Sequence, residues 1–206
     1  MKKYELTEET KVIDGKTLFR IRALRSFGDI KAGDLGGFIE NERNLSHEDN
    51  AWVSGNAKVI DNARVSDNAL VIDNARVSGE AWVDGNARVS GNARVIDNAR
   101  VSGYAKVGGK AIVGGEAWVS GEAQVSDDGL INSNNDYLCE KGLGSHNRSA
   151  SFFKCKDGHI HVLCGCFSGN LDEFENKVKE EHGNSKYAKE YLGFIEVVKT
   201  HFEVRQ

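Results

Sequence analysis

The sequence predicts a mainly β protein built around a parallel β-helix, and three observations in one stretch support this. Residues 51–128 comprise 78 residues, which divide without interruption into 13 units of six. The first position of every unit is Ala and the third is Val. The second position varies while its neighbours do not, as in a strand that buries alternate side chains. A hexapeptide period of this kind is a sequence signature of a parallel β-helix.

The second half of each unit has the composition of a tight corner. Position five is only Gly or Asp, and position six is most often Asn. Gly and Asn tolerate a positive φ, and Asp bonds to nearby backbone groups. Each unit is therefore expected to be a short strand followed by a corner. The interior would hold only Val and Ala, which leaves no room for a ligand cavity.

The order of small, aliphatic and polar residues in units such as Ala51–Asn56 resembles the left-handed β-helix of hexapeptide-repeat proteins. The resemblance implies three units in each triangular turn, so residues 51–128 would form a little over four turns. It also implies a homotrimer, the common assembly of these proteins.

Three units to a turn sort the outward-facing second positions onto three walls. One wall carries Trp52, Leu70, Arg88, Lys106 and Gln124. A second wall carries Lys58, Arg76, Arg94 and Ile112, and on the third Arg and Trp alternate from turn to turn at a spacing that suits cation–π contacts. Because Trp and Arg are favoured at interface centres, the candidate ligand or interface residues are Arg64, Trp82, Arg100, Trp118, Arg76 and Arg94.

Residues 1–50 are expected to form a β-rich N-terminal cap, because an open β-helix end exposes unpaired strand edges. Asp14-Gly15 lies between two apolar runs and predicts a hairpin. No apolar run follows the first residues, so neither a signal peptide nor a membrane span is expected. The net charge of −4 is well mixed along the chain, which gives no reason to expect nucleic acid as a partner.

Residues 129–206 are expected to form a C-terminal α+β domain. We predict a polar linker or loop over 129–149, a hairpin over 150–167, and helices over 170–182 and 185–204. Asn170 with Glu173 forms a capping box at the first helix, and Gly183 ends it. The loop segment Ser145, His146, Asn147 and Arg148 is a secondary candidate for ligand contacts, with a plain turn as the alternative.

Cysteines and histidines crowd into the predicted hairpin around Asp157-Gly158. A two-residue turn would place Lys156 opposite His159, and Cys155 opposite Ile160. Cys155, Cys164 and Cys166 would then share an apolar face, while His159 and His161 would point away from it. The spacing also lacks a paired Cys-x-x-Cys. These observations predict buried core thiols and no metal site.

The C-terminal segment carries a second resemblance. Residues 129–200, with Cys164–Gly169, Leu171–Phe174 and Tyr187–Leu192, are similar to a small domain common in phage and prophage proteins of bacteria. The resemblance implies a cytoplasmic location in a bacterial host.

The hexapeptide-repeat proteins include acyltransferases that bind coenzyme A between subunits and use a histidine as base. Residues 51–128 contain no histidine, and His47 and His146 are the ones near enough to reach a wall. This favours a non-enzymatic binding or scaffold protein without a cofactor, although an enzyme stays open. Such a protein would bind or sequester a host protein or a nucleotide-like ligand on its outer wall or in an intersubunit groove. The alternative is a CoA-dependent acyltransferase.

Overall fold

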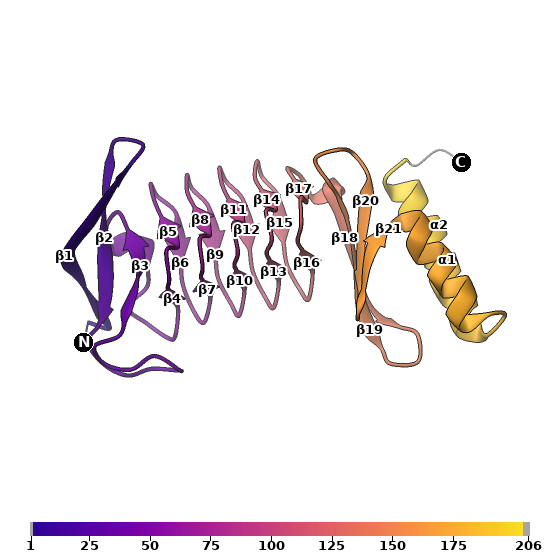
Figure 1. Cartoon of the computed structure of the whole chain (residues 1–206), viewed down its shortest axis with the longest axis horizontal. Coiled ribbons are helices and arrows are strands. Elements are labelled where there is room, and N and C mark those ends of the chain that lie inside the picture. Colours follow the sequence, from indigo (N-terminus) through magenta and orange to yellow (C-terminus); the bar gives the residue numbers. More distant parts are fainter. Residues whose placement is uncertain (1, 204–206) are drawn as a thin grey trace.

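The computed structural model describes residues 2–203, which form a rod with a different cap at each end (Figure 1). An N-terminal hairpin covers one end, stacked short strands form the middle, and a second sheet with two helices covers the other end. Among the described residues, no helix is both long and apolar enough to cross a membrane.

The N-terminal cap is a hairpin that joins the solenoid through a shared sheet. Strands β1 (Tyr4–Ile13) and β2 (Lys16–Ala23) are antiparallel, and the predicted turn at Asp14-Gly15 is confirmed. Both turn residues have positive φ, as a two-residue hairpin turn of this type requires. Strand β3 (Leu35–Ile39) pairs antiparallel with β2 on one side and parallel with β5 on the other. The 3-10 helix η1 (Glu42–Asn44) then leads into the first turn.

The solenoid consists of two-residue strands that begin every six residues. They are β4 (Trp52–Val53), β5 (Lys58–Val59), β6 (Arg64–Val65), β7 (Leu70–Val71), β8 (Arg76–Val77), β9 (Trp82–Val83), β10 (Arg88–Val89), β11 (Arg94–Val95), β12 (Arg100–Val101), β13 (Lys106–Val107), β14 (Ile112–Val113), β15 (Trp118–Val119), β16 (Gln124–Val125) and β17 (Leu130–Ile131). Each strand pairs in parallel with the strand 18 residues away, so three strands make one turn. With β3, they form a parallel β-solenoid of about five turns.

The three predicted walls correspond to the three sheets of the solenoid. The order β4-β7-β10-β13-β16 forms the first wall, β5-β8-β11-β14 the second and β6-β9-β12-β15 the third. The Ala and Val side chains between them are buried, as the alternation predicted. Trp52 differs from the other second-position residues, because it is covered by Phe27 and Tyr4 of the cap and is only 1% exposed.

Aspartates at the corners, which the sequence predicts only as turn residues, link successive turns of the solenoid. Asp61, Asp67, Asp73 and Asp97 have positive φ, and each carboxylate accepts a hydrogen bond from the backbone N–H of the glycine 18 residues later. The donor–acceptor distances are 2.9–3.1 Å. A corner Asp therefore links its own turn to the next.

The segment 129–149 contains more regular structure than the predicted loop. It includes β17, the 3-10 helix η2 (Asn134–Asp136), strand β18 (Tyr137–Leu143) and the start of β19 (Arg148–Lys154). The loop prediction is wrong because Gly129-Leu130-Ile131 continues the strand pattern with Gly in place of Ala and Ile in place of Val. A Cβ at Gly129 would lie 2.7 Å from Val125 Cγ1 and 3.1 Å from the ring of Phe153, which explains the missing methyl group.

The C-terminal sheet lies between the end of the solenoid and the two helices (Figure 1). Its order is β18-β19-β20-β21, with β20 spanning Ile160–Cys164 and β21 spanning Phe167–Asn170. Phe153 on one face belongs to the solenoid core, whereas Phe152 on the other packs with the helices.

The two predicted helices are present with slightly different bounds. Helix α1 spans Leu171–His182, with the capping box at Asn170 and Glu173 and a stop at Gly183. Helix α2 spans Lys186–His201 and has Ser185 as its N-cap. The predicted end of the second helix, residue 204, lies outside the described residues.

Candidate functional site

The third wall carries a continuous stack of arginine and tryptophan side chains, which we call the Arg–Trp ladder (Arg64, Trp82, Arg100 and Trp118). The guanidinium carbon of Arg64 lies 5.5 Å from the ring centre of Trp82, and that of Arg100 lies 5.7 Å from it. Arg100 is also 5.3 Å from the ring centre of Trp118. The cation–π alternation expected from the sequence is therefore present, yet Trp82 stays 43% exposed and Trp118 49% exposed.

Polar contacts hold the half of the ladder nearest the C-terminal domain in place. Arg100 forms an ion pair of 2.7 Å with Asp84, and the indole N–H of Trp118 donates to Ser102 Oγ at 2.8 Å. The hydroxyl of Tyr137 donates to the backbone carbonyl of Trp118 at 2.7 Å. These contacts orient Arg100 and Trp118 on the wall.

A hollow lies beside the end of the ladder. It has a volume of about 580 Å³, and Tyr104, Tyr137, Cys139 and Lys141 are among the residues that line it. Tyr104 sits at the adjacent corner and is 65% exposed. Aromatic surface therefore extends from the ladder toward the junction with β18.

The remaining candidates on the solenoid lie on a different wall. Arg76 and Arg94 are neighbours on β8 and β11 of the second wall. Arg76 donates to the carboxylate of Asp14 at 2.6 Å, so the tip of the N-terminal hairpin engages it. Arg94 is exposed. The structure does not bring this pair together with the ladder.

The secondary candidate loop is the turn between β18 and β19. Ser145 Oγ lies 2.9 Å from His146 Nδ1, and Asn147 occupies the left-handed region with φ 48°. Arg148 lines a pocket of about 230 Å³ with Phe174 and Tyr191 of the helices. These residues belong to the C-terminal domain rather than to the ladder.

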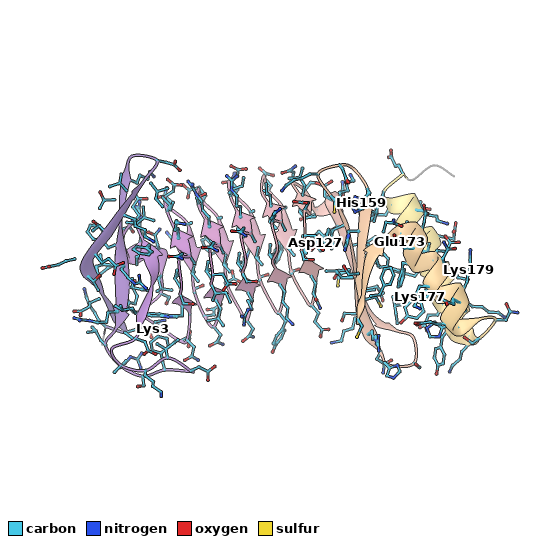
Figure 2. The ribbon with its side chains drawn as sticks, viewed as in Figure 1. Lys3, Asp127, His159, Glu173, Lys177 and Lys179 are labelled. Atoms are coloured by element: carbon cyan, nitrogen blue, oxygen red, sulfur yellow. The ribbon has the colours of Figure 1, made fainter. Side chains whose placement is uncertain are left out.

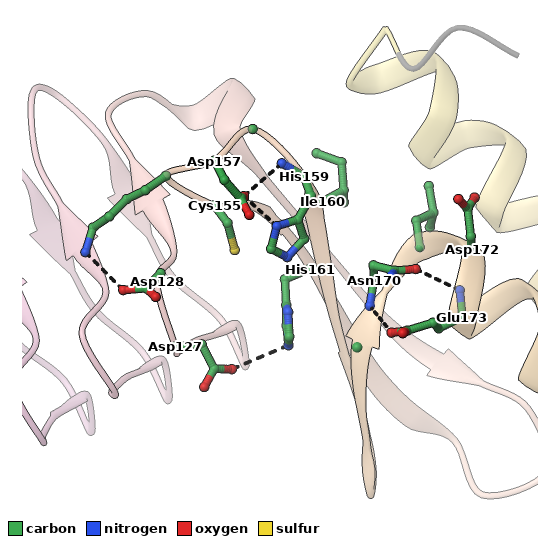
Figure 3. A pocket seen from close by; sticks show the side chains of 14 residues that line it. Asp127, Asp128, Cys155, Asp157, His159, Ile160, His161, Asn170, Asp172 and Glu173 are labelled. Atoms are coloured by element: carbon green, nitrogen blue, oxygen red, sulfur yellow. Dashed lines mark hydrogen bonds and ion pairs between the residues drawn. The ribbon is translucent and has the colours of Figure 1, made fainter.

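A larger pocket, of about 810 Å³, opens where the C-terminal sheet meets the last corner of the solenoid (Figure 3). The residues that line it include Asp127, Asp128, Cys155, Asp157, His159, His161 and Glu173. Figure 2 places Asp127 and His159 at this junction, at the opposite end of the rod from Lys3.

The predicted register of the hairpin in this pocket is wrong by one residue. Lys154 pairs with Ile160, and the backbone N–H of Cys155 donates to His159 O at 2.9 Å. Cys155 is therefore directly opposite His159 and on the same face as His161, not on the opposite face. Cys164 lies on the other face with the helices, and Cys166 is exposed rather than buried.

The turn itself explains the error. Lys156, Asp157 and Gly158 form a three-residue loop, in which Gly158 has a φ of 89°. A loop of three residues with Gly at a left-handed position is a common hairpin connection. The sequence Lys-Asp-Gly fits both a two-residue and a three-residue turn. The two-residue prediction placed Cys155 on the face opposite the histidines.

The pocket is acidic, and burial shifts the pKa of two groups inside it. Burial, reinforced by Asp157, Asp127 and Asp128, raises the pKa of the Cys155 thiol to about 11. Burial lowers the pKa of His161. At neutral pH, Cys155 alone is a protonated thiol and a poor nucleophile, because the thiolate is the reactive species.

Two segments of the solenoid, residues 63–79 and 87–103, match a family model described as the YdcK beta solenoid repeat. The chain is a β-solenoid repeat protein. Each matched segment covers almost one turn of the solenoid, and they include Arg64 and Arg100 of the ladder. No curated protein matches the chain.

Proposed function

We propose that this β-solenoid is a non-enzymatic binding protein and that the Arg–Trp ladder is its contact surface. The observation that carries the proposal is the pair of half-exposed indole rings of Trp82 and Trp118, which stack with arginines of the neighbouring turns. Large exposed aromatic surface on a rigid wall is typical of an interaction site.

The shape of the ladder favours a protein partner over a small molecule. The interior of the solenoid is filled by Ala and Val, and the ladder residues stand on the outside of a sheet. Small ligands bind in concave sites that bury most of their surface, whereas protein interfaces are flatter and centre on Trp, Tyr and Arg. The partner we favour is another protein, either a host protein or a second copy of this chain.

The positions of two histidines support binding rather than acyl transfer. The ring of His47 stacks on Tyr4 at 4.3 Å, and its Nδ1 accepts the backbone N–H of Lys3. His146 lies in the β18–β19 turn of the C-terminal domain. A base for acyl transfer must reach its acceptor directly or through one water, and neither of these two histidines stands on a solenoid wall.

Four finer features stay predictions of the sequence resemblances. They are the left-handed winding of the solenoid, the homotrimer, the phage or prophage type of the protein and its place in the cytoplasm of a bacterial host. A trimer would bury part of a wall, and we assign that contact to the third wall, which carries the ladder.

The test compares the intact protein with the double variant Trp82→Ala/Trp118→Ala by light scattering and native mass spectrometry. A protein heavier than the 22.6 kDa chain that becomes a monomer in the variant supports self-association through the ladder. A co-purified protein that is lost in the variant supports a heterologous protein partner. A bound species of nucleotide mass would instead show that the ladder binds a small ligand and not a protein.

The matched control is Arg88→Ala/Lys106→Ala, which removes exposed residues from the first wall. Buried Trp52 provides an internal fluorescence reference, because the ladder tryptophans alone should respond to a partner. If the double tryptophan variant keeps the same mass and the same partners as the intact protein, the ladder is not the contact surface.

A further inference from the structure

Three potential metal ligands converge at the edge of the C-terminal pocket. Cys155 follows the end of β19, His159 precedes β20 and His161 lies within β20 (Figure 3). One ligand atom from each of the three side chains lies within 4.8 Å of the others. The three-residue turn brings them together, because it pairs Cys155 with His159 and leaves His161 on the same face.

Both histidines also have an oxygen partner at one ring nitrogen. His159 Nδ1 lies 2.5 Å from the carboxylate of Asp157. His161 Nε2 lies 2.9 Å from Ser168 Oγ and 3.4 Å from the carboxylate of Asp127. Each ring keeps its second nitrogen for another ligand. A histidine that binds a metal usually has such a partner, which fixes the orientation of the ring.

Asp127 reaches this pocket because of its place in the solenoid. It occupies the corner position that carries Asp61, Asp67, Asp73 and Asp97 in earlier turns, and like them it has a positive φ. Those carboxylates bond to a glycine 18 residues later, but position 145 lies outside the stack, in the β18–β19 turn. The last corner carboxylate therefore faces His161 instead of another turn.

We propose that Cys155, His159 and His161 bind a divalent transition-metal ion, with Zn²⁺ the best match, at the junction of the solenoid and the C-terminal domain. A thiolate and two imidazoles are donors that suit Zn²⁺ and disfavour Ca²⁺ or Mg²⁺. Tetrahedral bonds of about 2.0–2.3 Å place ligand atoms roughly 3.5 Å apart, so a small contraction of the cluster would close the site.

Cys155, His159 and His161 all line the pocket of about 810 Å³, so an ion bound by them would have its fourth coordination position open to that pocket. Three protein ligands with an open fourth position are typical of zinc sites that bind a water or another small ligand. Asp127, Asp128 and Glu173 also line this pocket and add negative charge that attracts a cation. The inference is independent of the Arg–Trp ladder, which lies on the third wall.

Packing is the competing explanation of the same cluster. The rings of Phe153 and His161 are 5.3 Å apart, and those of His159 and His161 are 5.8 Å apart. Cys155 also belongs to the buried core at the end of the solenoid. If packing were the whole explanation, the cluster would have no affinity for a metal. A metal-binding measurement therefore distinguishes a packing role from a metal site.

The probe is Co²⁺, titrated into the full chain after treatment with a chelator. We expect one ion per chain, with a thiolate-to-cobalt charge-transfer band and the strong visible absorption of a tetrahedral site. Cys155→Ser should remove the charge-transfer band, and His159→Ala should weaken binding on the order of 100-fold. Asp157→Asn, which alters the partner of His159, should weaken it about 10–100-fold.

Cys166→Ser is the matched control, because Cys166 is exposed and lies outside the cluster. If Cys155→Ser fails to fold by circular dichroism, His159→Ala decides the question, since His159 is exposed and its truncation should leave the fold intact. The proposal is overturned if neither Co²⁺ nor Zn²⁺ binds at micromolar concentration. It is equally overturned if His159→Ala binds cobalt as tightly as the intact chain.

Discussion

The two ends of the rod are closed by different means. At the N-terminal end, β3 continues a solenoid sheet through backbone hydrogen bonds, and β2 and β1 extend it further. At the C-terminal end, the last turn meets the face of a separate sheet through side chains such as Phe153, and the backbones of the two are joined, among the described residues, only by an isolated bridge between Gly129 and Cys155. A backbone ladder leaves little space beside it, whereas contact between two independent sheets leaves the acidic pocket at its edge.

The polar groups of the two ends differ in the same way. Lys3 is fully buried in the N-terminal cap and donates to the carbonyls of Glu48, Asp49 and Ala51. The histidines of the C-terminal junction instead line a pocket that is open to solvent. The comparison teaches that a sealed end uses its polar groups for structure, while an imperfectly covered end leaves them available for ligands.

Phe153→Ala is the variant expected to have the largest effect, because it should open the C-terminal junction and leave the N-terminal cap unchanged. Phe153 is fully buried between β19 and the end of the solenoid, so its truncation should cost about 3–5 kcal/mol. We expect the C-terminal domain to separate from the solenoid, which chemical denaturation and limited proteolysis near residues 132–136 would detect. Phe152→Ala is the matched control, because it faces the helices and should destabilise that domain without opening the junction. Equal proteolysis of both variants would contradict a junction held by Phe153.

Gly129→Ala tests the same junction from the solenoid side. The new methyl group would lie 2.7 Å from Val125 Cγ1 and 3.1 Å from the ring of Phe153. Overpacking of this kind costs about 1–3 kcal/mol, although Ala is the residue at this position in all 13 units of residues 51–128. A double-mutant cycle with Phe153→Ala should recover part of the loss. Additive costs of the two changes would show that the ring does not exclude the methyl group.

Buried Lys3 at the N-terminal end should make the stability of the protein depend on pH. Burial, with a contribution from Arg25, lowers the pKa of Lys3 from 10.5 to about 8. Between these values the unfolded chain binds more protons than the native protein, so native stability should rise with pH. From pH 8 to 9.5 we expect a gain of about 1.5 kcal/mol relative to Lys3→Met. Denaturation curves of both proteins at the two pH values measure it, and parallel pH profiles would refute the assignment.

The smallest expected effect is a difference in stability between a variant of an inner corner and a variant of the last corner. Asp73→Gly keeps the positive φ but removes the acceptor of the Gly91 N–H, at a cost of about 1 kcal/mol. Asp127→Gly, measured without added metal, should cost less, because no glycine of a further turn bonds to Asp127. Thermal unfolding of the two variants makes the comparison. An equal loss at both corners would mean that the hydrogen bond between turns contributes little.

The sequence predicted the solenoid well because its information is local and repeated. Ala and Val at fixed positions place the strands, and the 18-residue turn places Arg64, Trp82, Arg100 and Trp118 on one wall. The corner aspartates were recognised as turn residues, but their bonds to the next turn depend on how turns stack. That stacking is not visible within a single unit.

The ends were harder to predict because they depend on contacts between distant segments. Leu130-Ile131 continues the solenoid although Gly replaces Ala, because a methyl group there would crowd both Val125 and the ring of Phe153 from a later strand. One residue of register then decided whether Cys155 faced His159. Periodicity cannot fix that register when two turn lengths fit the same Lys-Asp-Gly sequence.

Because one turn contains three strands, the number of six-residue units controls both the length of the rod and the rotation of one cap relative to the other. Inserting 18 residues would lengthen it by about 4.8 Å and return the C-terminal domain to the same orientation. Inserting a single unit of six would advance the junction by one wall, so that the acidic pocket would turn by a third of a revolution relative to the N-terminal hairpin. The number of units therefore sets both the distance between the two caps and the direction in which each faces.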